Sequence, residues 1–324
     1  MKIYVIISHR IGDTNMGKKV FKTIDEQIEI LKGKGLSFEN FDNPADVLVR
    51  ENYFFLNGYR HVFLKSPIDS AFIEGTNFSE LYALFSFDRQ LRNILFKNIL
   101  ILENNIKSIF SYVISKNHGY KETSYLDAKI FTKDQHKIRQ INDLLRKMKR
   151  QIRVNGRQHN ATRHYIDNYG YLPLWIVVKV LSFGIVCELY SILTREDQEE
   201  IATYFKTKVE DLLVFLPVLS NYRNLCAHED ICYEHKNAIG IKPNTYHSLL
   251  EIPKIKDEYI YGLNDLFSLI IILKYLLRKD DFTTCMNEIS YEIDVLTGKL
   301  HTINISKVLD RMGFPLNYKE IMKL

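Results

Sequence analysis

The chain has 324 residues, of which 46% are hydrophobic and 26% charged, proportions that are ordinary for a soluble globular protein. Because this length exceeds what one hydrophobic core usually supports, we expect one large domain or two closely packed ones. The net charge of +5 permits an anionic partner without requiring one. Four cysteines in so long a chain exclude a disulfide framework and favour a reducing cytoplasm.

The first ten residues, MKIYVIISHR, contain only a short apolar stretch, and no small-residue cleavage site follows it. We therefore do not interpret them as a signal peptide. Met16 is a second candidate for the start of translation, because a well-patterned segment follows it at once. The most apolar run elsewhere, residues 266–277, is too short to span a bilayer and contains Lys274, so it predicts a buried helix and no membrane partner.

Two short helices are predicted near the N-terminus. Thr23 and Glu26 form a capping-box pattern that opens the first helix. Asn43 followed by Pro44 supplies the cap and first-turn proline of the second, which we expect to run to Tyr59. Together these helices predict an N-terminal helical unit within residues 1–64.

The longest periodic segment follows, over residues 79–116. Leucines and isoleucines recur at three, four and seven residues, which predicts a helix with one apolar stripe facing a core. Asp88 with Arg92, and Glu103 with Lys107, are spaced as i,i+4 ion pairs, and we expect both pairs on the opposite, solvated face.

The remaining segments also have helical period. Further helices are predicted over residues 134–152, from Pro173 through an apolar stretch to about 193, over 194–205, from about 208 to 228, and over 258–279, with short ones to the C-terminus. Strand signals are scarce throughout. The sequence therefore predicts an all-α protein.

One stretch is strongly basic. Residues 137–164 contain nine lysines and arginines against a single acid, Asp143, and histidines and tyrosines flank them. One interpretation is a solvated helix face. The other is a groove for single-stranded RNA, where cations follow the phosphates and aromatic rings stack on bases. The residues predicted to bind RNA are Arg146, Lys147, Lys149, Arg150, Arg153, Arg157, His159, Arg163 and His164.

The segment SNYRNLCAHED, residues 220–230, follows an apolar run and allows three interpretations. Cys226, His228, Cys232 and His235 are zinc-competent residues, but their spacing matches no familiar zinc pattern. We therefore expect Cys226 to be a core residue and no metal to be bound. The second interpretation is a polar helix end in which Arg223 and His228 have only structural roles.

The third interpretation is catalytic. At about 100° per residue, Asn224 and His228 lie on one face of a helix, with Arg223 about 140° from His228. Metal-free RNA cleavage needs an acid–base group near neutral pKa, as histidine provides, and a cation for the transition-state charge, as arginine provides. One Arg and one His make half of such a site, so a second copy of the chain is the simplest source of the rest.

The residues RNLCAH resemble the R-x4-6-H motif of the HEPN superfamily. The chain also resembles the abortive-infection family of AbiD/AbiF type, over most of residues 20–235. The segments that carry this resemblance are TIDEQIEILKGKGL, NYFFLNGYRHVF, LFSFDRQLRNILFKNILILENNIKS and YLPLWIVVKVLSFGIVCELYSIL. The resemblance implies a HEPN-type helical bundle: a HEPN-like core over residues 79–280 with a basic insertion at 134–170, and a C-terminal helical extension over 281–324.

The resemblance also implies a function. We expect a cytoplasmic phage-defence protein, a homodimer that cleaves single-stranded RNA without a cofactor and leaves a 2′,3′-cyclic phosphate. Arg223 would stabilise transition-state charge, His228 would act as acid–base, and Asn224 would be the polar second position. A cognate small non-coding RNA, as in a toxin–antitoxin pair, is the expected regulator.

Two alternatives stay open. The HEPN site can instead belong to a regulator that binds RNA without cutting it, or the chain can be a helical adaptor that acts through protein contacts. Arg153-x5-His159 and Arg157-x6-His164 also fit the R-x4-6-H spacing. So many cations make such matches expected by chance, and we expect these residues to contact RNA backbone.

Overall fold

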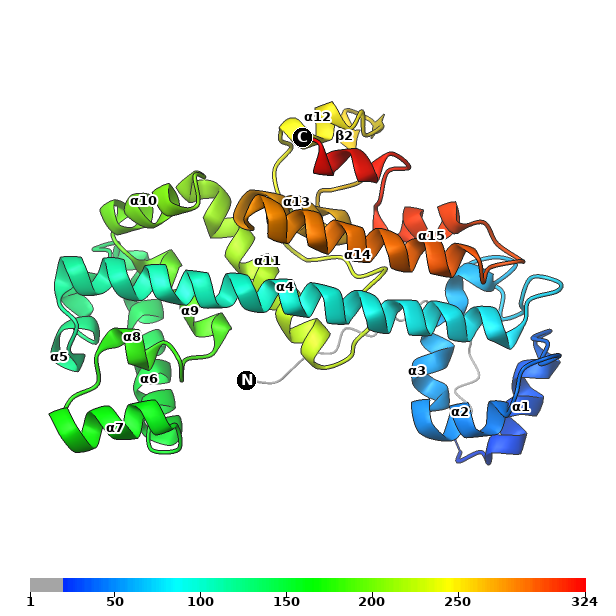
Figure 1. The fold of residues 1–324 in the computed structure, drawn as a ribbon, viewed down its shortest axis with the longest axis horizontal. Coiled ribbons are helices and arrows are strands. Elements are labelled where there is room, and N and C mark those ends of the chain that lie inside the picture. The colour runs from blue at the N-terminus through cyan, green and yellow to red at the C-terminus, as the bar shows by residue number, and fades with distance from the viewer. Residues whose placement is uncertain (1–19) are drawn as a thin grey trace.

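The computed structural model describes residues 20–324, so both candidate start sites lie outside the described residues. Within them the fold is all-α, as predicted, with one short antiparallel hairpin of β1 (Lys254–Ile255) and β2 (Glu258–Tyr259). Its central element is α4 (Phe78–His118), a 41-residue helix that runs the length of the molecule in Figure 1. At 1.5 Å per residue α4 is about 60 Å long.

The N-terminal unit contains α1 (Ile24–Gly33), α2 (Pro44–Glu51) and α3 (Tyr53–Gly58), followed by a 3₁₀ turn over Tyr59–Phe63. The predicted capping box of Thr23 and Glu26 is present. The prediction of one helix from Pro44 to Tyr59 is wrong, because Asn52 has φ of +65° and ends α2. Its side chain accepts a hydrogen bond from the N–H of Phe54 and so caps α3.

The prediction of a long helix over 79–116 is confirmed by α4, which begins with a capping box of Asn77 and Glu80. The prediction that the ion pairs of this helix lie on a solvated face is wrong. Helices pack against α4 on more than one side, among them α10 (Arg195–Tyr204), α11 (Val209–Ala227) and α14 (Lys279–Thr297). Asp88, Arg92 and Glu103 are therefore buried. Both i,i+4 pairs exist, but inside the protein.

A second lobe lies at the C-terminal end of α4 (Figure 1) and comprises α5 (Glu122–Tyr125), α6 (Ile138–Asn155), α7 (Asn160–Tyr169) and α8 (Leu174–Val177). The single apolar helix predicted from Pro173 is wrong. It is divided into α8 and α9 (Phe183–Ile192), because Ser182 is extended and donates its N–H to Gln151 of α6.

The rest of the chain adds six helices, three of which (α10, α11 and α14) pack against α4. It contains α10 (Arg195–Tyr204), α11 (Val209–Ala227), α12 (Thr245–Leu249), α13 (Leu266–Leu276), α14 (Lys279–Thr297) and α15 (Ile305–Met312). The helix predicted over 258–279 starts only at Leu266, where Asp265 caps it, because the hairpin occupies the residues before. No helix among the described residues is long and apolar enough to cross a membrane.

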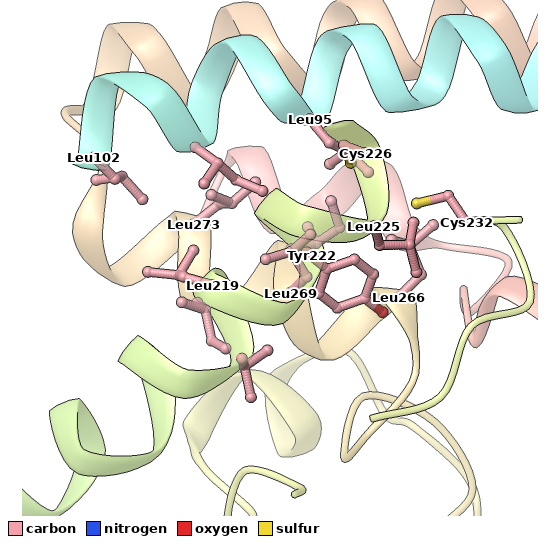
Figure 2. Close-up of a cluster of buried hydrophobic side chains, with 14 of the residues drawn as sticks. Leu95, Leu102, Leu219, Tyr222, Leu225, Cys226, Cys232, Leu266, Leu269 and Leu273 are labelled. Carbon is pink, nitrogen blue, oxygen red and sulfur yellow. The ribbon is translucent and has the colours of Figure 1, made fainter. Parts of the chain in front are cut away.

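The end of α11 is embedded in the core. Figure 2 shows Tyr222, Leu225 and Cys226 of α11 packed among leucines of α4 and α13, with Leu95 and Leu102 on α4. All of these side chains are at most 8% exposed. The packing fixes where α11 ends, and thereby where the polar residues on its outer side lie.

Candidate functional site

The segment from Arg223 to Asp230 forms the C-terminal end of α11. His228 is the C-cap residue, and its N–H donates to the carbonyl of Asn224 at 3.0 Å. Glu229 then adopts φ of +57°, and the N–H of Asp230 donates to the carbonyl of Leu225, which closes a Schellman-type turn. The turn leaves the His228 side chain exposed to solvent.

A buried carboxylate on α4 holds the loop that follows His228. Asp88 accepts hydrogen bonds from the backbone N–H groups of Cys232 (3.0 Å) and Tyr233 (2.7 Å) and from the hydroxyl of Tyr59 (2.7 Å). It also pairs with Arg92 at 2.6 Å. α4 and the N-terminal unit therefore determine the position of the end of α11.

Burial shapes the electrostatics of this network. It raises the pKa of Asp88, while the charge of Arg92 and the donors from Cys232, Tyr233 and Tyr59 act in the opposite direction. Burial alone lowers the pKa of Arg92, but Asp88, Tyr59 and Cys232 together outweigh it and the pKa is raised. The short contact and the four converging donors fit an ionised carboxylate paired with a charged guanidinium.

Arg223 is engaged within the protein. Its Nε donates to Oε2 of Glu103 at 3.3 Å, and its guanidinium lies 5.8 Å from the centre of the Phe96 ring. The second oxygen of Glu103 accepts from Lys107 at 2.7 Å. With 33% of its side chain exposed, Arg223 is accessible to an anion that competes with Glu103.

Asn224 and His228 border different hollows. Asn224 lines a cleft of about 440 Å³ between α11, α9 and α6, beside Ser220, Glu188 and Gln140. His228 lines a groove of about 1290 Å³ between the end of α11, α4 and the N-terminal unit. Of the three residues predicted to be catalytic, one is thus tied to α4 and the other two border separate hollows on either side of α11.

The groove beside His228 combines cations with aromatic rings. Arg60 and Arg89 line it, and Arg89 is held by Glu51 and stacks on Phe85 with 4.7 Å between the guanidinium carbon and the ring centre. The rings of Phe54 and Phe55, which also line it, are 74% and 56% exposed. Charged and flat apolar groups thus surround the exposed histidine.

The four zinc-competent residues have separate environments. Cys226 and Cys232 are buried side by side, and burial raises the pKa of the Cys232 thiol well above its usual range. His235 packs edge-on against Tyr222, and burial lowers its pKa, whereas His228 is exposed. Within residues 20–324 no three histidine, cysteine or acidic side chains are grouped as metal ligands. Cys226 packs in the core, as expected from its sequence context.

The residues predicted to bind RNA lie on α6, α7 and the turn between them, and all are exposed. Arg146 pairs with Asp143 on its own helix, and Lys147 pairs with Glu188 at 2.8 Å. The other five cations form no ion pair within the described residues, 20–324. They are Lys149, Arg150, Arg153, Arg157 and Arg163.

The two predicted histidines of this stretch have local partners. His159 caps α7 through a 3.3 Å hydrogen bond from the N–H of Ala161. His164 contacts Asn168 at 3.1 Å and the rings of Tyr165 and Tyr169. These contacts favour a structural contribution of the two histidines to α7, whose one arginine, Arg163, is exposed.

Sequence reasoning missed Asp88, Arg92 and Glu103 as parts of the site. Their spacing indicated ion pairs, but an i,i+4 pattern is the same for exposed and buried pairs. A usable signal was the register of Asp88, which follows Leu84 by four residues and precedes Leu91 by three, so that it falls within the apolar stripe of this helical segment. Charged residues inside such a segment are costly unless they are paired, which points to a buried network.

The fold and this geometry define an all-helical protein with an arginine and an exposed histidine at the end of a helix that is otherwise packed in the core. The chain belongs to the family of Abi-like proteins, which it matches over residues 46–234, from α2 to the loop anchored by Asp88. The abortive-infection family predicted from the sequence is thereby confirmed. No curated protein and no solved structure matches the chain.

Proposed function

We propose that this Abi-like protein is an abortive-infection effector that binds single-stranded RNA and cleaves it at a site containing Arg223 and His228. The observation that carries the proposal is the exposed His228, fixed at the end of α11 by the Asp88 network and bordering a groove of about 1290 Å³. Membership of the Abi-like family agrees with a role in abortive infection.

The chemistry follows from the residue types. His228 would take the proton of the attacking 2′-hydroxyl or give one to the 5′-oxygen leaving group, because imidazole titrates near neutral pH. Arg223 would leave Glu103 and stabilise the charge on the phosphorane. Asn224, which borders the hollow on the other side of α11, would orient the phosphate in a site completed by a second copy of the chain. The products would be a 2′,3′-cyclic phosphate and a 5′-hydroxyl.

One chain supplies a single Arg–His pair at this position, and we infer that a second copy supplies the other. The exposed surface at the end of α11 would form the contact, so that two R-x4-6-H motifs face one another as in a HEPN dimer. In this arrangement Asn224 and His228 of one copy, which border different hollows, would each face residues of the other copy.

The basic surface of α6 and α7 would hold the RNA backbone. Its five cations outside the ion pairs suit a polyanion, and binding should weaken steeply with salt. A cognate small non-coding RNA bound there would restrain the protein until infection. Cytoplasmic RNA is the expected partner in both roles.

The test is RNA cleavage by the purified full-length chain, with new ends mapped by whether they carry a 5′-hydroxyl. His228→Ala should lose at least about a hundredfold in rate, the usual contribution of a general acid–base group. It should keep the stability of the wild type, because the side chain is exposed. Full cleavage by His228→Ala would refute the proposal.

A non-cleaving RNA regulator is the second candidate, and one observation favours it: Arg223 is held by Glu103 in the single chain rather than directed at the His228 groove. The two candidates differ in their products. Both predict that charge reversal at Lys149 and Arg153 weakens RNA binding, but only the ribonuclease produces 5′-hydroxyl ends that disappear in His228→Ala.

A further inference from the structure

A row of aromatic rings lies exposed where α4 ends and α7 and α8 meet. Neighbouring ring centres are 5.4 Å apart for Trp175 and Tyr120, 5.9 Å for Tyr120 and Tyr171, 6.4 Å for Tyr171 and Tyr169, and 5.2 Å for Tyr169 and Tyr165. We name these five residues the aromatic row. The side chains of Trp175, Tyr120 and Tyr169 are 43%, 39% and 57% exposed.

The row is built on a rigid frame. The N–H of Leu174 donates to the carbonyl of Tyr120 at 3.0 Å, which places Tyr120 beside Trp175. The N–H of Leu172 donates to Glu122 at 2.6 Å, and the buried hydroxyl of Tyr125 donates to the carbonyl of Leu172 at 3.0 Å. Two segments far apart in the sequence, residues 120–125 and 172–175, are thereby held together before any ligand binds.

Cations border the row. The Nζ of Lys121 lies 4.6 Å from the centre of the Tyr171 ring. Arg163 is exposed on α7, the same helix that carries Tyr165 and Tyr169, and the basic surface of α6 belongs to the same lobe (Figure 1). Two acids lie in these segments: Glu122 already accepts the N–H of Leu172, and Asp167 is exposed on α7, where the cations of the lobe outnumber it. The surroundings of the rings are thus suited to a polyanion.

We propose that the aromatic row is a stacking platform for the bases of single-stranded RNA, with Lys121 and Arg163 contacting its phosphates. Stacking on aromatic rings beside cations is how proteins bind single strands with little sequence preference, because every base has a flat face. A duplex keeps its bases stacked on one another and cannot use the row. A proline-rich peptide would suit the rings but would make no use of the cations.

This inference rests on the proposed function and assigns it a second site. Arg92, which contacts the loop after His228, and His118, at the end of α4, are separated by 26 residues of helix, or about 40 Å. RNA held on the row is therefore anchored far from the cleavage site of the same chain. The row would select for single strands while the end of α11 performs the chemistry.

Trp175 is the only tryptophan of the chain, so its fluorescence reports on the row directly. The experiment titrates full-length His228→Ala protein, which keeps RNA intact, with a single-stranded RNA of about 12 nucleotides and with a duplex of the same sequence. We expect the single strand to quench Trp175 emission and the duplex to leave it unchanged. Quenching by a proline-rich peptide but not by RNA would overturn the inference.

Substitution separates stacking from charge. In the same His228→Ala background, Tyr169→Ala should weaken binding of the single strand about tenfold, the effect expected of one lost base stack. The matched control is Tyr291→Ala, which removes a tyrosine that is 65% exposed on α14. Tyr291→Ala should bind as tightly as the parent. Equal affinities of the two variants would overturn the inference.

The experiments distinguish a failure of the aromatic row from a failure of the proposed function. If the row variants bind RNA normally while the wild type still produces 5′-hydroxyl ends, the row is refuted and the ribonuclease stands. If RNA quenches Trp175 and Tyr169→Ala weakens binding, but wild type and His228→Ala yield the same ends, the row stands and cleavage by His228 is refuted.

Discussion

Asp88 accepts a 2.7 Å hydrogen bond from the backbone N–H of Tyr233, which lies 145 residues further along the chain. The same carboxylate accepts the N–H of Cys232 and pairs with Arg92, so α4 and the loop after His228 share one buried polar network. A network that is fully satisfied in this way specifies a single arrangement, because any shift leaves buried groups unpaired.

Asp88→Ala should therefore be severely destabilising. It leaves Arg92 buried without its counter-charge, a change that typically costs about 3–5 kcal/mol. Arg92→Met should cost less, since Asp88 keeps Tyr59 and two backbone N–H donors. Urea unfolding of the two variants measures the order. A smaller loss for Asp88→Ala than for Arg92→Met would contradict the role of the carboxylate as the centre of the network.

Local signals predicted the helices that depend on local interactions. The capping box of Thr23 and Glu26 and the apolar period of residues 79–116 are properties of neighbouring residues, and both elements formed as expected. The helix expected over 258–279 was wrong at its start. The hairpin of β1 and β2 precedes it, and Asp265, rather than the apolar period, determines where α13 begins.

The position of the candidate residues Arg223 and His228 in the fold was predictable, but the directions of their side chains were not. The spacing of Arg223 and His228 places both at a helix end, and the structure confirms that position. Which way each side chain faces depends on partners that lie far away in the sequence: Glu103 holds Arg223, and the N-terminal unit forms the groove beside His228. No local pattern contains that information.

The titration of Asp265 should make the free energy of unfolding depend on pH. Burial raises its pKa from 3.8 to about 6, and the N–H groups of Gly262 and Ser268 oppose the rise only in part. A carboxyl whose folded pKa exceeds the unfolded value contributes stability that is complete below pH 3.8 and is lost as the pH rises through 6. The difference corresponds to about 3 kcal/mol.

Comparing the wild type with Asp265→Asn isolates the contribution of Asp265, because all other groups titrate in the same way in the two proteins. Between pH 4 and pH 7 the stability of the wild type relative to Asp265→Asn should fall. Chemical denaturation at several pH values measures it. A difference that is constant over this range, or that grows with pH, would exclude the predicted titration.

Glu229 occupies a conformation that favours glycine. Its φ of +57° at the turn after His228 strains a side chain that carries a Cβ atom, and Glu229→Gly should stabilise the protein by about 1 kcal/mol. Glu229→Ala removes the same charge and keeps the strain, so it should not stabilise. Thermal unfolding of the two variants decides the point, and equal midpoints would show that strain at this position is unimportant.

Glu103 competes with RNA for Arg223 in the proposed function. Its carboxylate accepts from the Nε of Arg223 at 3.3 Å, and a partly exposed pair of this kind contributes at most about 1 kcal/mol. Glu103→Gln removes the charge that Arg223 must leave, so the rate of RNA cleavage at low substrate concentration should rise up to about fivefold. Lys107 keeps an oxygen acceptor in the variant.

Glu288→Gln is the matched control. Glu288 also pairs with a cation of α4, Lys97 at 2.7 Å, but it lies on α14 and its ion pair does not involve Arg223. The control variant should leave the rate unchanged. Combining Glu103→Gln with Arg223→Ala should abolish the gain, since the released guanidinium is its cause. Slower cleavage by Glu103→Gln would contradict this prediction. It would mean that the carboxylate of Glu103 holds Arg223 in its active orientation and does not compete with the phosphate for it.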